Sequence, residues 1–359
     1  MSENPLSPPP PSRRMAEITI DPSAIAANWR WFDALGPAET AAVVKADAYG
    51  LGAEGAARAL LAAGARTFFT ATLAEARIVR RVIGAEPLLY VLNGPSTDDA
   101  AKFAEISARP VLNSLAQIAL WEARGPAALH IDTGMNRLGL SLGDVAPAAS
   151  ALAGADIPLV LSHLACASTR DHPMNAEQRA AFMAAAASFP NARLSLAATA
   201  GALLGRDFHF DMIRPGLGLY GSGGMDADNP KLSVAARITA PILQLRDVPE
   251  GAPFGYGATR KAPRPMRAAT VAIGYADGFL RSFGPKGYGV LNGMKLNLLG
   301  RVSMDLVILD ATDAPGAKVG DKVEFLGEHA RLDEIAEAAG SAPYEILTTF
   351  AGGVRAARA

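Results

Sequence analysis

Lys45 is the residue whose type and surroundings most directly suggest covalent chemistry. It stands in the stretch AVVKADAYG, after an apolar run that begins at Ala41. Apolar neighbours exclude water from an amine and lower its pKa, which makes a lysine nucleophilic at neutral pH. We therefore predict Schiff-base chemistry at Lys45, although a solvated lysine at the end of a strand is the simpler interpretation of one residue alone.

His163 and Arg214 are further candidates. His163 ends the run PLVLSH, where a histidine with core hydrogen bonds is the alternative interpretation. Arg214 opens RPGLGLYGSGG, and a guanidinium there must find an acceptor because it does not lose its proton. A bound cofactor or substrate would supply that acceptor. The glycine N–H groups of this stretch suit a phosphate, or they belong to a plain loop.

Two tyrosines near the C-terminal end of the chain follow glycines. FGYGATR contains Tyr256, AIGYADGF contains Tyr275, and GRVSMDLVILD contains Asp305. Glycine lets a backbone approach another group closely, although ordinary turns explain glycines equally well. Because the chain has only 7 tyrosines, the Gly-Tyr pairs that contain Tyr256 and Tyr275 favour a functional interpretation.

Composition excludes several classes of function. The 359 residues include 34 Lys and Arg against 35 Asp and Glu, so no overall field attracts nucleic acid or an anionic membrane. The single cysteine, Cys166, excludes an intramolecular disulfide and a Cys-rich metal site. HExxH, Walker-type and GxSxG motifs are missing, so we predict no metal site.

The N-terminus and the apolar runs indicate a soluble protein of the cytoplasm. No apolar run reaches the roughly 20 residues that a membrane helix needs. MSENPLSPPPPSRRM has prolines where a secretory signal has its apolar core. We predict that residues 1–15 form a flexible, polyproline-like leader.

Short apolar runs alternate with Ala-rich segments of helical length, a pattern typical of parallel βα units. Helices are expected near 52–63, 73–82, 97–107, 115–123 and 176–188, and a strand followed by a helix is expected from Glu17, with Asp21 as the N-cap. Eight strand candidates are AAVVKA from Ala41, RTFFTA from Arg66, PLLYVL from Pro87, RPVL from Arg109, AALHID from Ala127, PLVLSH from Pro158, RLSLAA from Arg193 and MIRPGLGL from Met212.

Eight such units predict a closed (β/α)8, TIM-like barrel of the α/β class over residues 16–231, with an open doubly wound sheet as the alternative. After Pro230 the pattern changes to β-branched, alternating segments separated by Gly and Pro turns. This change predicts a mostly β domain over residues 232–359, with a late helix near 332–339.

Active sites of parallel barrels form at the carboxyl ends of the strands. The polar residues at these ends are Lys45, Tyr49, Asp132, Arg137, His163, Thr199, Arg214 and Tyr220. We expect these side chains to gather in one place.

Taken together, seven ordered motifs resemble one family along nearly the whole chain. They are AVVKADAYGLG, DTGMNRLG, LSHLACA, RPGLGLYG, FGYGATR, IGYADGF and GRVSMD. The chain resembles the alanine racemases, pyridoxal-phosphate isomerases built from a TIM-like barrel and a C-terminal β domain. The resemblance implies interconversion of L- and D-alanine and a supply of D-alanine for peptidoglycan.

The resemblance also implies two catalytic bases on opposite faces of the substrate. Lys45 is expected to hold pyridoxal phosphate as an imine and to act as one base, with Tyr256 as the other. Tyrosine, with an ordinary pKa of about 10, needs nearby positive charge to act as a base, and His163 and Arg214 are the candidates for it. Arg214 is also expected at the pyridine nitrogen, where a cation disfavours protonation of the ring.

The remaining roles follow by the same resemblance. The cofactor phosphate is assigned to Tyr49, Thr199, Gly216, Leu217 and Tyr344. The substrate is assigned to Arg137, Met304, Tyr275 and Asp305. The β domain is expected to complete the barrel site of another subunit, which implies a homodimer with shared active sites.

Two departures from the family pattern stand out. His130 occupies a position where the family often has a carbamylated lysine, so the partner of Arg137 is left open. Thr199 replaces a common serine and keeps the hydroxyl.

The alternatives to an alanine racemase are a racemase of serine or of broader specificity, a non-catalytic pyridoxal-phosphate carrier and a basic-amino-acid decarboxylase. The carrier class lacks the β domain, and the C-terminal cysteine motif of the decarboxylase is missing here.

Overall fold

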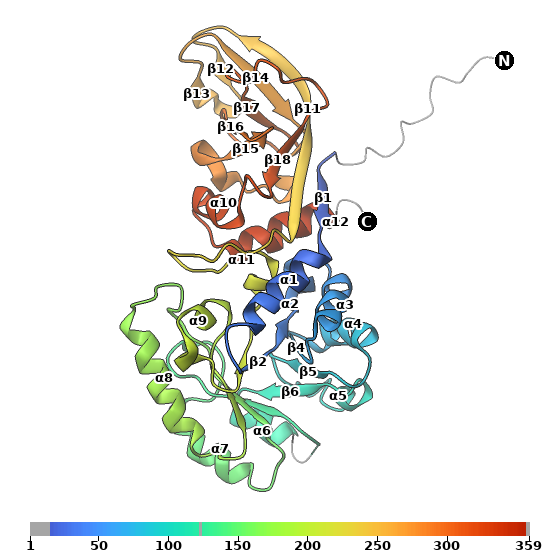
Figure 1. The fold of residues 1–359 in the computed structure, drawn as a ribbon, viewed down its shortest axis with the longest axis vertical. Helices are drawn as coiled ribbons and strands as arrows, with labels where there is room; N and C mark the ends of the chain where they lie inside the picture. The colour runs from blue at the N-terminus through green and yellow to red at the C-terminus, as the bar shows by residue number, and fades with distance from the viewer. Residues whose placement is uncertain (1–14, 122–123, 357–359) are drawn as a thin grey trace, which may run out of the picture. The chain divides into compact units, whose positions relative to one another are not determined.

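The computed structural model describes residues 15–121 and 124–356, so the leader expected over 1–15 lies outside the described residues except for Met15. The chain divides into two compact units. The barrel unit spans Ile20–Ala235, and the β unit begins at Ala236 (Figure 1). Strand β1 (Glu17–Ile20) pairs with strand β11 and so extends the sheet of the β unit.

The barrel unit is built on short parallel strands that neighbour one another in chain order. They are β2 (Glu39–Thr40), β3 (Ala42–Val43), β4 (Thr67–Thr70), β5 (Leu88–Val91), β6 (Arg109–Leu112), β7 (Ala128–His130), β8 (Leu159–Leu161), β9 (Arg193–Ser195) and β10 (Met212–Ile213). Each of the eight predicted strand regions contains one of them. The order from β3 to β9 never reverses, whereas an open doubly wound sheet requires a reversal.

Strand β10 closes the ring of strands. Met212 pairs with Glu39 of β2, and a parallel bridge joins Arg214 to Ala198, just beyond β9. The N–H of Val43 donates to the carbonyl of Pro215 at 3.1 Å, which continues the pairing. The last strand therefore returns to the first, and the open-sheet alternative is wrong.

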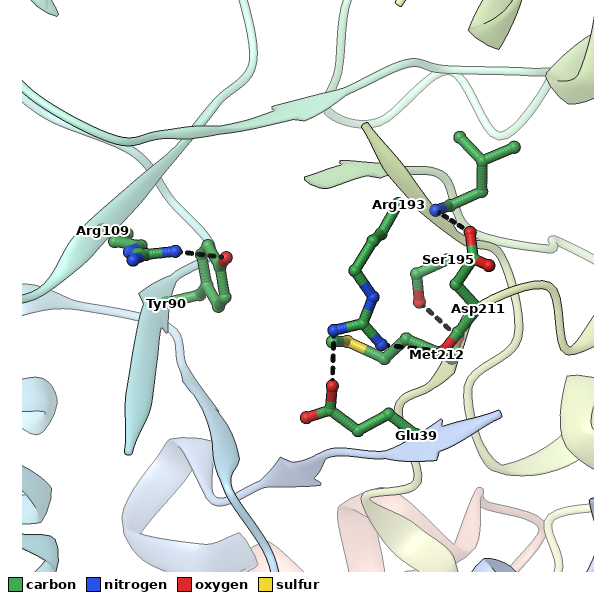
Figure 2. A network of polar contacts seen from close by, with 8 residues as sticks. Glu39, Tyr90, Arg109, Arg193, Ser195, Asp211 and Met212 are labelled. Atoms are coloured by element: carbon green, nitrogen blue, oxygen red, sulfur yellow. Dashed lines mark hydrogen bonds and ion pairs between the residues drawn. The ribbon is translucent and has the colours of Figure 1, made fainter. Parts of the chain in front are cut away.

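Polar side chains reinforce this closure, as Figure 2 shows. One guanidinium nitrogen of Arg193 lies 2.6 Å from a carboxylate oxygen of Glu39, and the other donates to the carbonyl of Asp211 at 2.9 Å. The hydroxyl of Ser195 donates to the carbonyl of Met212 at 2.6 Å. Because the ion pair is partly exposed, it stabilises the fold by no more than about 1 kcal/mol.

Helices lie outside the barrel strands (Figure 1). They are α1 (Pro22–Asp33), α2 (Lys45–Tyr49), α3 (Ala53–Ala63), α4 (Leu73–Ile83), α5 (Lys102–Glu105), α6 (Leu115–Trp121), α7 (Val145–Ala151), α8 (Pro173–Ala186) and α9 (Thr199–Leu203). The predicted cap of α1 is confirmed, because the Asp21 carboxylate accepts the N–H groups of Ser23 and Ala24.

One predicted helix is much shorter than expected. The segment 97–107 is helical only over Lys102–Glu105. The carboxylate of Asp99 accepts the N–H of Ser96 at 2.7 Å, which favours a local turn over helix. Residue Ser107, with φ of 49°, then ends the helical path.

The β unit is an antiparallel sheet around the long strand β11 (Ala236–Val248) (Figure 1). Its other strands are β14 (Met266–Val271), β15 (Tyr288–Leu291), β16 (Met294–Asn297), β17 (Val307–Asp310) and β18 (Lys322–Leu326), and β12 (Pro253–Phe254) pairs separately with β13 (Arg260–Lys261). Phe279 stacks on Phe283 with ring centroids 4.2 Å apart, which forms part of the core.

The C-terminal segment holds more helix than the alternating pattern predicts. Helix α10 (Leu332–Ala339) lies where a late helix was expected. Helix α11 (Pro343–Ile346), a π-helical turn (Leu347–Ala351) and helix α12 (Gly352–Ala356) follow it and were missed. Among the helices that the structure describes, none is both long enough and apolar enough to cross a membrane.

Candidate active site

The candidate site of the barrel unit lies at the carboxyl ends of its strands, as expected. Lys45 stands two residues after β3, His163 two residues after β8, and Arg214 directly after β10. The register pairs His130 with Leu161 and Leu161 with Ser195, so these side chains point to the same side of the sheet. His163, two residues beyond Leu161, shares that side.

The backbone after Lys45 makes an unusual left-handed turn. Ala46, Asp47, Ala48 and Tyr49 have φ between 52° and 57°, which costs about 1 kcal/mol for each non-glycine residue. Two carboxylates hold this turn. Glu75 accepts the N–H of Ala46 at 2.9 Å, and Asp47 accepts the N–H of Ala53 at 2.7 Å. Strained backbone conformations of this kind cluster at active sites, where they hold a side chain in one orientation.

Glu75 contacts the backbone that follows Lys45, and the sequence did not single it out. Its second oxygen accepts the N–H groups of Ala71 and Thr72, and the hydroxyl of Thr72 accepts the N–H of Glu75 in return. This arrangement is a capping box at the start of α4. The spacing T-x-x-E at Thr72 and Glu75 predicts the cap, but nothing local predicts the contact with Ala46.

The environment of Lys45 lowers the pKa of its amine. Burial lowers the pKa of Lys45, and the positive charge of Arg137 lowers it further. The negative charge of Glu75 opposes this by raising the same pKa, and the charge of Arg214 adds to the lowering. A neutral amine is the form that attacks a carbonyl carbon and accepts a proton.

Arg214 is buried, with 4% of its surface exposed, and is held by carbonyl oxygens. One terminal nitrogen donates to the carbonyl and hydroxyl of Ser195, and the other to the carbonyls of Ser162 and Leu196. These four contacts use all four terminal N–H bonds, whereas the Nε–H has no acceptor among the described residues. Burial lowers the pKa of Arg214 to about 10, so the group stays charged at neutral pH.

His163 differs from the sequence expectation in its charge. Burial holds the pKa of His163 well below 6.5, and the positive charges of Arg214, Arg137 and Lys45 lower it further. The imidazole is therefore neutral at neutral pH. The role of His163 beside a tyrosine base stays a prediction, and of the two candidates for positive charge Arg214 is the one whose pKa lies well above 7.

A cradle of N–H groups surrounds Thr199. Its hydroxyl oxygen accepts the N–H of Gly216 at 3.0 Å and the N–H of Gly218 at 3.1 Å. The N–H of Leu217, between them, has no acceptor among the residues that the structure describes. A Cβ at Gly216 would lie 2.3 Å from the Tyr49 hydroxyl, so only glycine fits there. An N–H without an acceptor at this place suits an anionic group.

The loop that carries Arg137 is organised by Asp132. One oxygen of this carboxylate accepts the N–H groups of Gly134 and Met135, each at 2.8 Å, and the other accepts the N–H of Arg137 at 3.2 Å. The guanidinium of Arg137 is exposed and has no acceptor in the described part of the chain. It is available to bind a carboxylate.

His130 lies buried at the end of β7. Its Nδ1 lies 2.9 Å from the amide oxygen of Asn113, a contact that the sequence did not reveal. Burial lowers the pKa of His130 to about 4; the positive charges of Arg214 and Arg137 contribute to this lowering, and Asp132 opposes it. The residue is therefore neutral at neutral pH.

The other expected site residues belong to the β unit. Tyr256 begins a 3-10 turn (Tyr256–Ala258) and is 71% exposed. Tyr275 and Met304 lie side by side, because the N–H groups of Tyr275 and Ala276 donate to the carbonyls of Ser303 and Met304. Both side chains are exposed, as are those of Asp305 and Tyr344.

Comparison with known proteins shows one consistent likeness. The family model described as alanine racemase, N-terminal domain, matches residues 20–223, and the model for the C-terminal domain matches residues 235–358. An alanine racemase of Rhodospirillum rubrum is 43% identical, with 96% of this chain and 97% of that protein covered. A biosynthetic alanine racemase of Agrobacterium fabrum is also 43% identical, with 92% and 90% covered.

A solved structure is similar in fold as well. The crystal structure of alanine racemase from Bartonella henselae, with covalently bound pyridoxal phosphate, has a TM-score of 0.89 and 38% sequence identity. The match covers 94% of this chain and 97% of that one. The likeness therefore extends over both units of the chain.

The low pKa of His130 predicts a loss of stability in acid. Between pH 6.5 and about pH 4 the unfolded chain binds a proton at this residue that the folded chain does not. The free energy of unfolding should therefore fall as the pH drops through this window, by about 3 kcal/mol from His130 alone.

Thermal unfolding measured across this pH window checks the prediction. We expect a flatter pH dependence in His130→Asn than in the wild type, and no flattening in His172→Asn, which changes an exposed helix cap. If stability depends on pH equally in the wild type and in His130→Asn, then His130 has the same pKa in the folded and the unfolded chain, and the prediction is wrong.

Proposed function

This chain belongs to the alanine racemase family, and we propose from that premise which of its residues carry out the reaction. The enzyme is an isomerase that interconverts L-alanine and D-alanine. The observation that best supports a residue assignment is the setting of Lys45. Its amine has a lowered pKa at the carboxyl end of a parallel barrel, in the unit that also holds the cradle around Thr199.

The polar groups of the barrel unit fit pyridoxal phosphate, the cofactor. The amine of Lys45 would hold its aldehyde carbon covalently. The N–H of Leu217 and the hydroxyls of Thr199 and Tyr49 would bind the phosphate, together with Gly216. The Nε–H of Arg214, which lacks an acceptor among the described residues, would face the pyridine nitrogen. We also assign Tyr344 of the β unit to the phosphate.

Racemisation needs a proton removed from one face of the substrate and a proton returned on the other. When bound, pyridoxal phosphate withdraws electrons from the α-carbon of alanine and so makes its proton acidic. We assign the two transfers to the amine of Lys45 and the hydroxyl of Tyr256. Lys45 suits this role because its pKa is lowered, which increases the neutral fraction of its amine.

Arg214 and His163 support the bases electrostatically. Arg214 keeps its positive charge, and a cation at the pyridine nitrogen would keep that nitrogen unprotonated. His163 stays neutral, so it adds no second positive charge beside Arg214. We propose that this arrangement limits side reactions that need a protonated ring.

Arg137 is the proposed binding group for the substrate carboxylate. Its guanidinium has no acceptor among the described residues, and a guanidinium binds a carboxylate through two parallel hydrogen bonds. Met304, Tyr275 and Asp305 gather at one exposed place on the β unit and would complete the substrate pocket. Tyr275 would restrict its entrance to small side chains.

We propose a homodimer in which the β unit of one subunit completes the barrel site of the other. The strong exposure of Tyr256 and the neighbouring exposure of Tyr275 and Met304 support this, because a proposed base and pocket wall face outward from their own unit. We place the enzyme in the cytoplasm, where D-alanine would enter peptidoglycan precursors. The β unit argues against the carrier alternative, because that protein class lacks it.

The direct test is chiral quantification of alanine. Purified protein with added pyridoxal phosphate is incubated with L-alanine, and D-alanine is measured over time. We expect approach to an equal mixture. Equilibration of serine without alanine would favour the alternative of serine or broader specificity. No racemisation of either, by protein whose lysine holds the cofactor, would favour another amino acid or the carrier alternative.

Replacement of Tyr256 tests the two-base assignment. Tyr256→Phe should keep the covalent cofactor, visible by absorbance, and lose exchange of the α-proton from one enantiomer by about 100-fold or more. Exchange in deuterium oxide is measured separately for L- and D-alanine. Tyr288→Phe, which removes a hydroxyl bonded to Glu334, serves as the matched control. Equal loss from both enantiomers would contradict the assignment.

Mixing two inactive variants tests the shared site. In a heterodimer of Lys45→Ala and Tyr256→Phe, one of the two sites combines an intact lysine with an intact tyrosine from the other subunit. Random exchange of subunits should restore about a quarter of the wild-type rate. A mixture that stays inactive, although mass spectrometry shows heterodimers, would place both bases in one subunit.

A further inference from the structure

The carboxylate of Glu75 bridges two loops at the carboxyl end of the barrel. One of its oxygens accepts the N–H of Ala46 at 2.9 Å, in the loop after β3. The other accepts the N–H groups of Ala71 at 2.7 Å and Thr72 at 3.3 Å, in the loop after β4. Strands β3 and β4 are parallel neighbours, so both loops leave the same edge of the sheet. Glu75 therefore joins the loop that follows Lys45 to the next loop of the barrel.

The backbone before Lys45 is held by the barrel strands themselves. The N–H of Val43 donates to the carbonyl of Pro215 at 3.1 Å, and the N–H of Val44 donates to the carbonyl of Phe69 at 2.9 Å. These bonds continue the parallel pairing of the strands. They fix the backbone up to Lys45, but they do not determine the direction of the chain after it.

The backbone after Lys45 continues as the left-handed turn over Ala46–Tyr49. The N–H groups of Ala48 and Gly50 each donate to the carbonyl four residues earlier, at 3.0 and 2.8 Å. These bonds close the turn, but they do not orient it relative to the barrel. The first N–H of a helical turn has no acceptor within the turn, and here Glu75 accepts it.

The bond between Glu75 and Ala46 does more than satisfy one N–H group. Ala46 is exposed, so water could accept its N–H in place of the carboxylate. Water would not connect this N–H to the loop after β4. That connection needs an acceptor oxygen on each side, which a carboxylate provides. A glutamine has one such oxygen, and its amide nitrogen would set a donor against a backbone N–H.

We propose that Glu75 is a positioning residue, which holds the turn after Lys45 and thereby fixes the position of the Lys45 amine for proton transfer. The inference rests on the proposed function, because Lys45 moves a proton there. Glu75 acts through the backbone, so its loss should change the placement of the amine while the cofactor still binds. Displacement of a catalytic group by about 1 Å can slow a reaction by about 100-fold.

The first test is hydrogen exchange of backbone N–H groups in the cofactor-loaded enzyme. Glu75→Ala removes both acceptor oxygens. Thr72→Val is the matched control, because it removes the hydroxyl that accepts the N–H of Glu75 and so weakens the same helix cap without breaking the bridge. We expect faster exchange in the peptide over residues 45–52 in Glu75→Ala and wild-type exchange there in Thr72→Val. Wild-type exchange of this peptide in Glu75→Ala overturns the inference.

The second test is racemisation by the same proteins. Burial lowers the pKa of Lys45 and the charge of Glu75 opposes this, so kcat is compared at the plateau of its pH profile, where the protonation of Lys45 no longer limits it. In Glu75→Ala we expect kcat to fall about 10-fold to 100-fold, with KM for alanine changed less than about twofold. The absorbance of the covalent cofactor should remain. Thr72→Val should keep kcat within about twofold of the wild type.

Glu75→Gln keeps the size of the side chain and serves if Glu75→Ala does not fold. Because it retains one acceptor oxygen, it should keep one side of the bridge and lose about tenfold in kcat, less than Glu75→Ala. An equal loss in Thr72→Val would assign the effect to the helix cap and overturn the positioning role. Wild-type kcat in both Glu75 variants would overturn it as well.

The outcomes separate this inference from the proposed function. If the wild type racemises alanine and the Glu75 variants do so at the same rate, the positioning role is wrong and the proposed function stands. If the wild type binds the cofactor covalently but does not racemise, the proposed function fails, and the positioning role for proton transfer fails with it.

Discussion

The buried positive charge of Arg214 is the constraint on which the barrel site depends. A guanidinium removed from water is costly unless its N–H bonds are satisfied, and here backbone carbonyls satisfy them. Those carbonyls come from residues just beyond or within β8 and β9, whereas Arg214 follows β10. The charge is therefore accommodated only when the last strands close the ring. Closure of the barrel and accommodation of this buried charge therefore depend on the same hydrogen bonds.

That charge also acts on the pKa values of its neighbours. Burial is the largest cause of the lowered pKa of His163, His130 and Lys45, and the charge of Arg214 lowers each of them further. The result is a cationic group of side chains in which both histidines are neutral. Neutral imidazoles accept hydrogen bonds and leave the excess positive charge for a ligand to balance. A phosphate and a carboxylate are ligands of the right sign.

Sequence reasoning succeeded where the signal is local. The cap at Asp21 and the late helix over Leu332–Ala339 each depend on residues close together in the chain, and the eight strand regions follow from short apolar runs. The missed features are contacts across the fold. Glu75 meets Ala46, and Asn113 meets His130, at separations of 29 and 17 residues. The lowered pKa of His163 was also not foreseen, because burial and surrounding cations cause it and neither is visible in a motif.

The left-handed turn over Ala46–Tyr49 has a consequence for redesign. Four successive alanine, aspartate and tyrosine residues in this conformation violate local preference. A design method that matches each residue type to its backbone conformation would replace them with glycine. Glycine removes the steric cost of the left-handed conformation, but it makes the backbone more flexible. The backbone loosened in this way is the segment that directly follows Lys45. Substitutions made to stabilise this chain should therefore leave that turn unchanged. The left-handed conformation is unfavourable for these residues, and the same conformation fixes the backbone that follows Lys45.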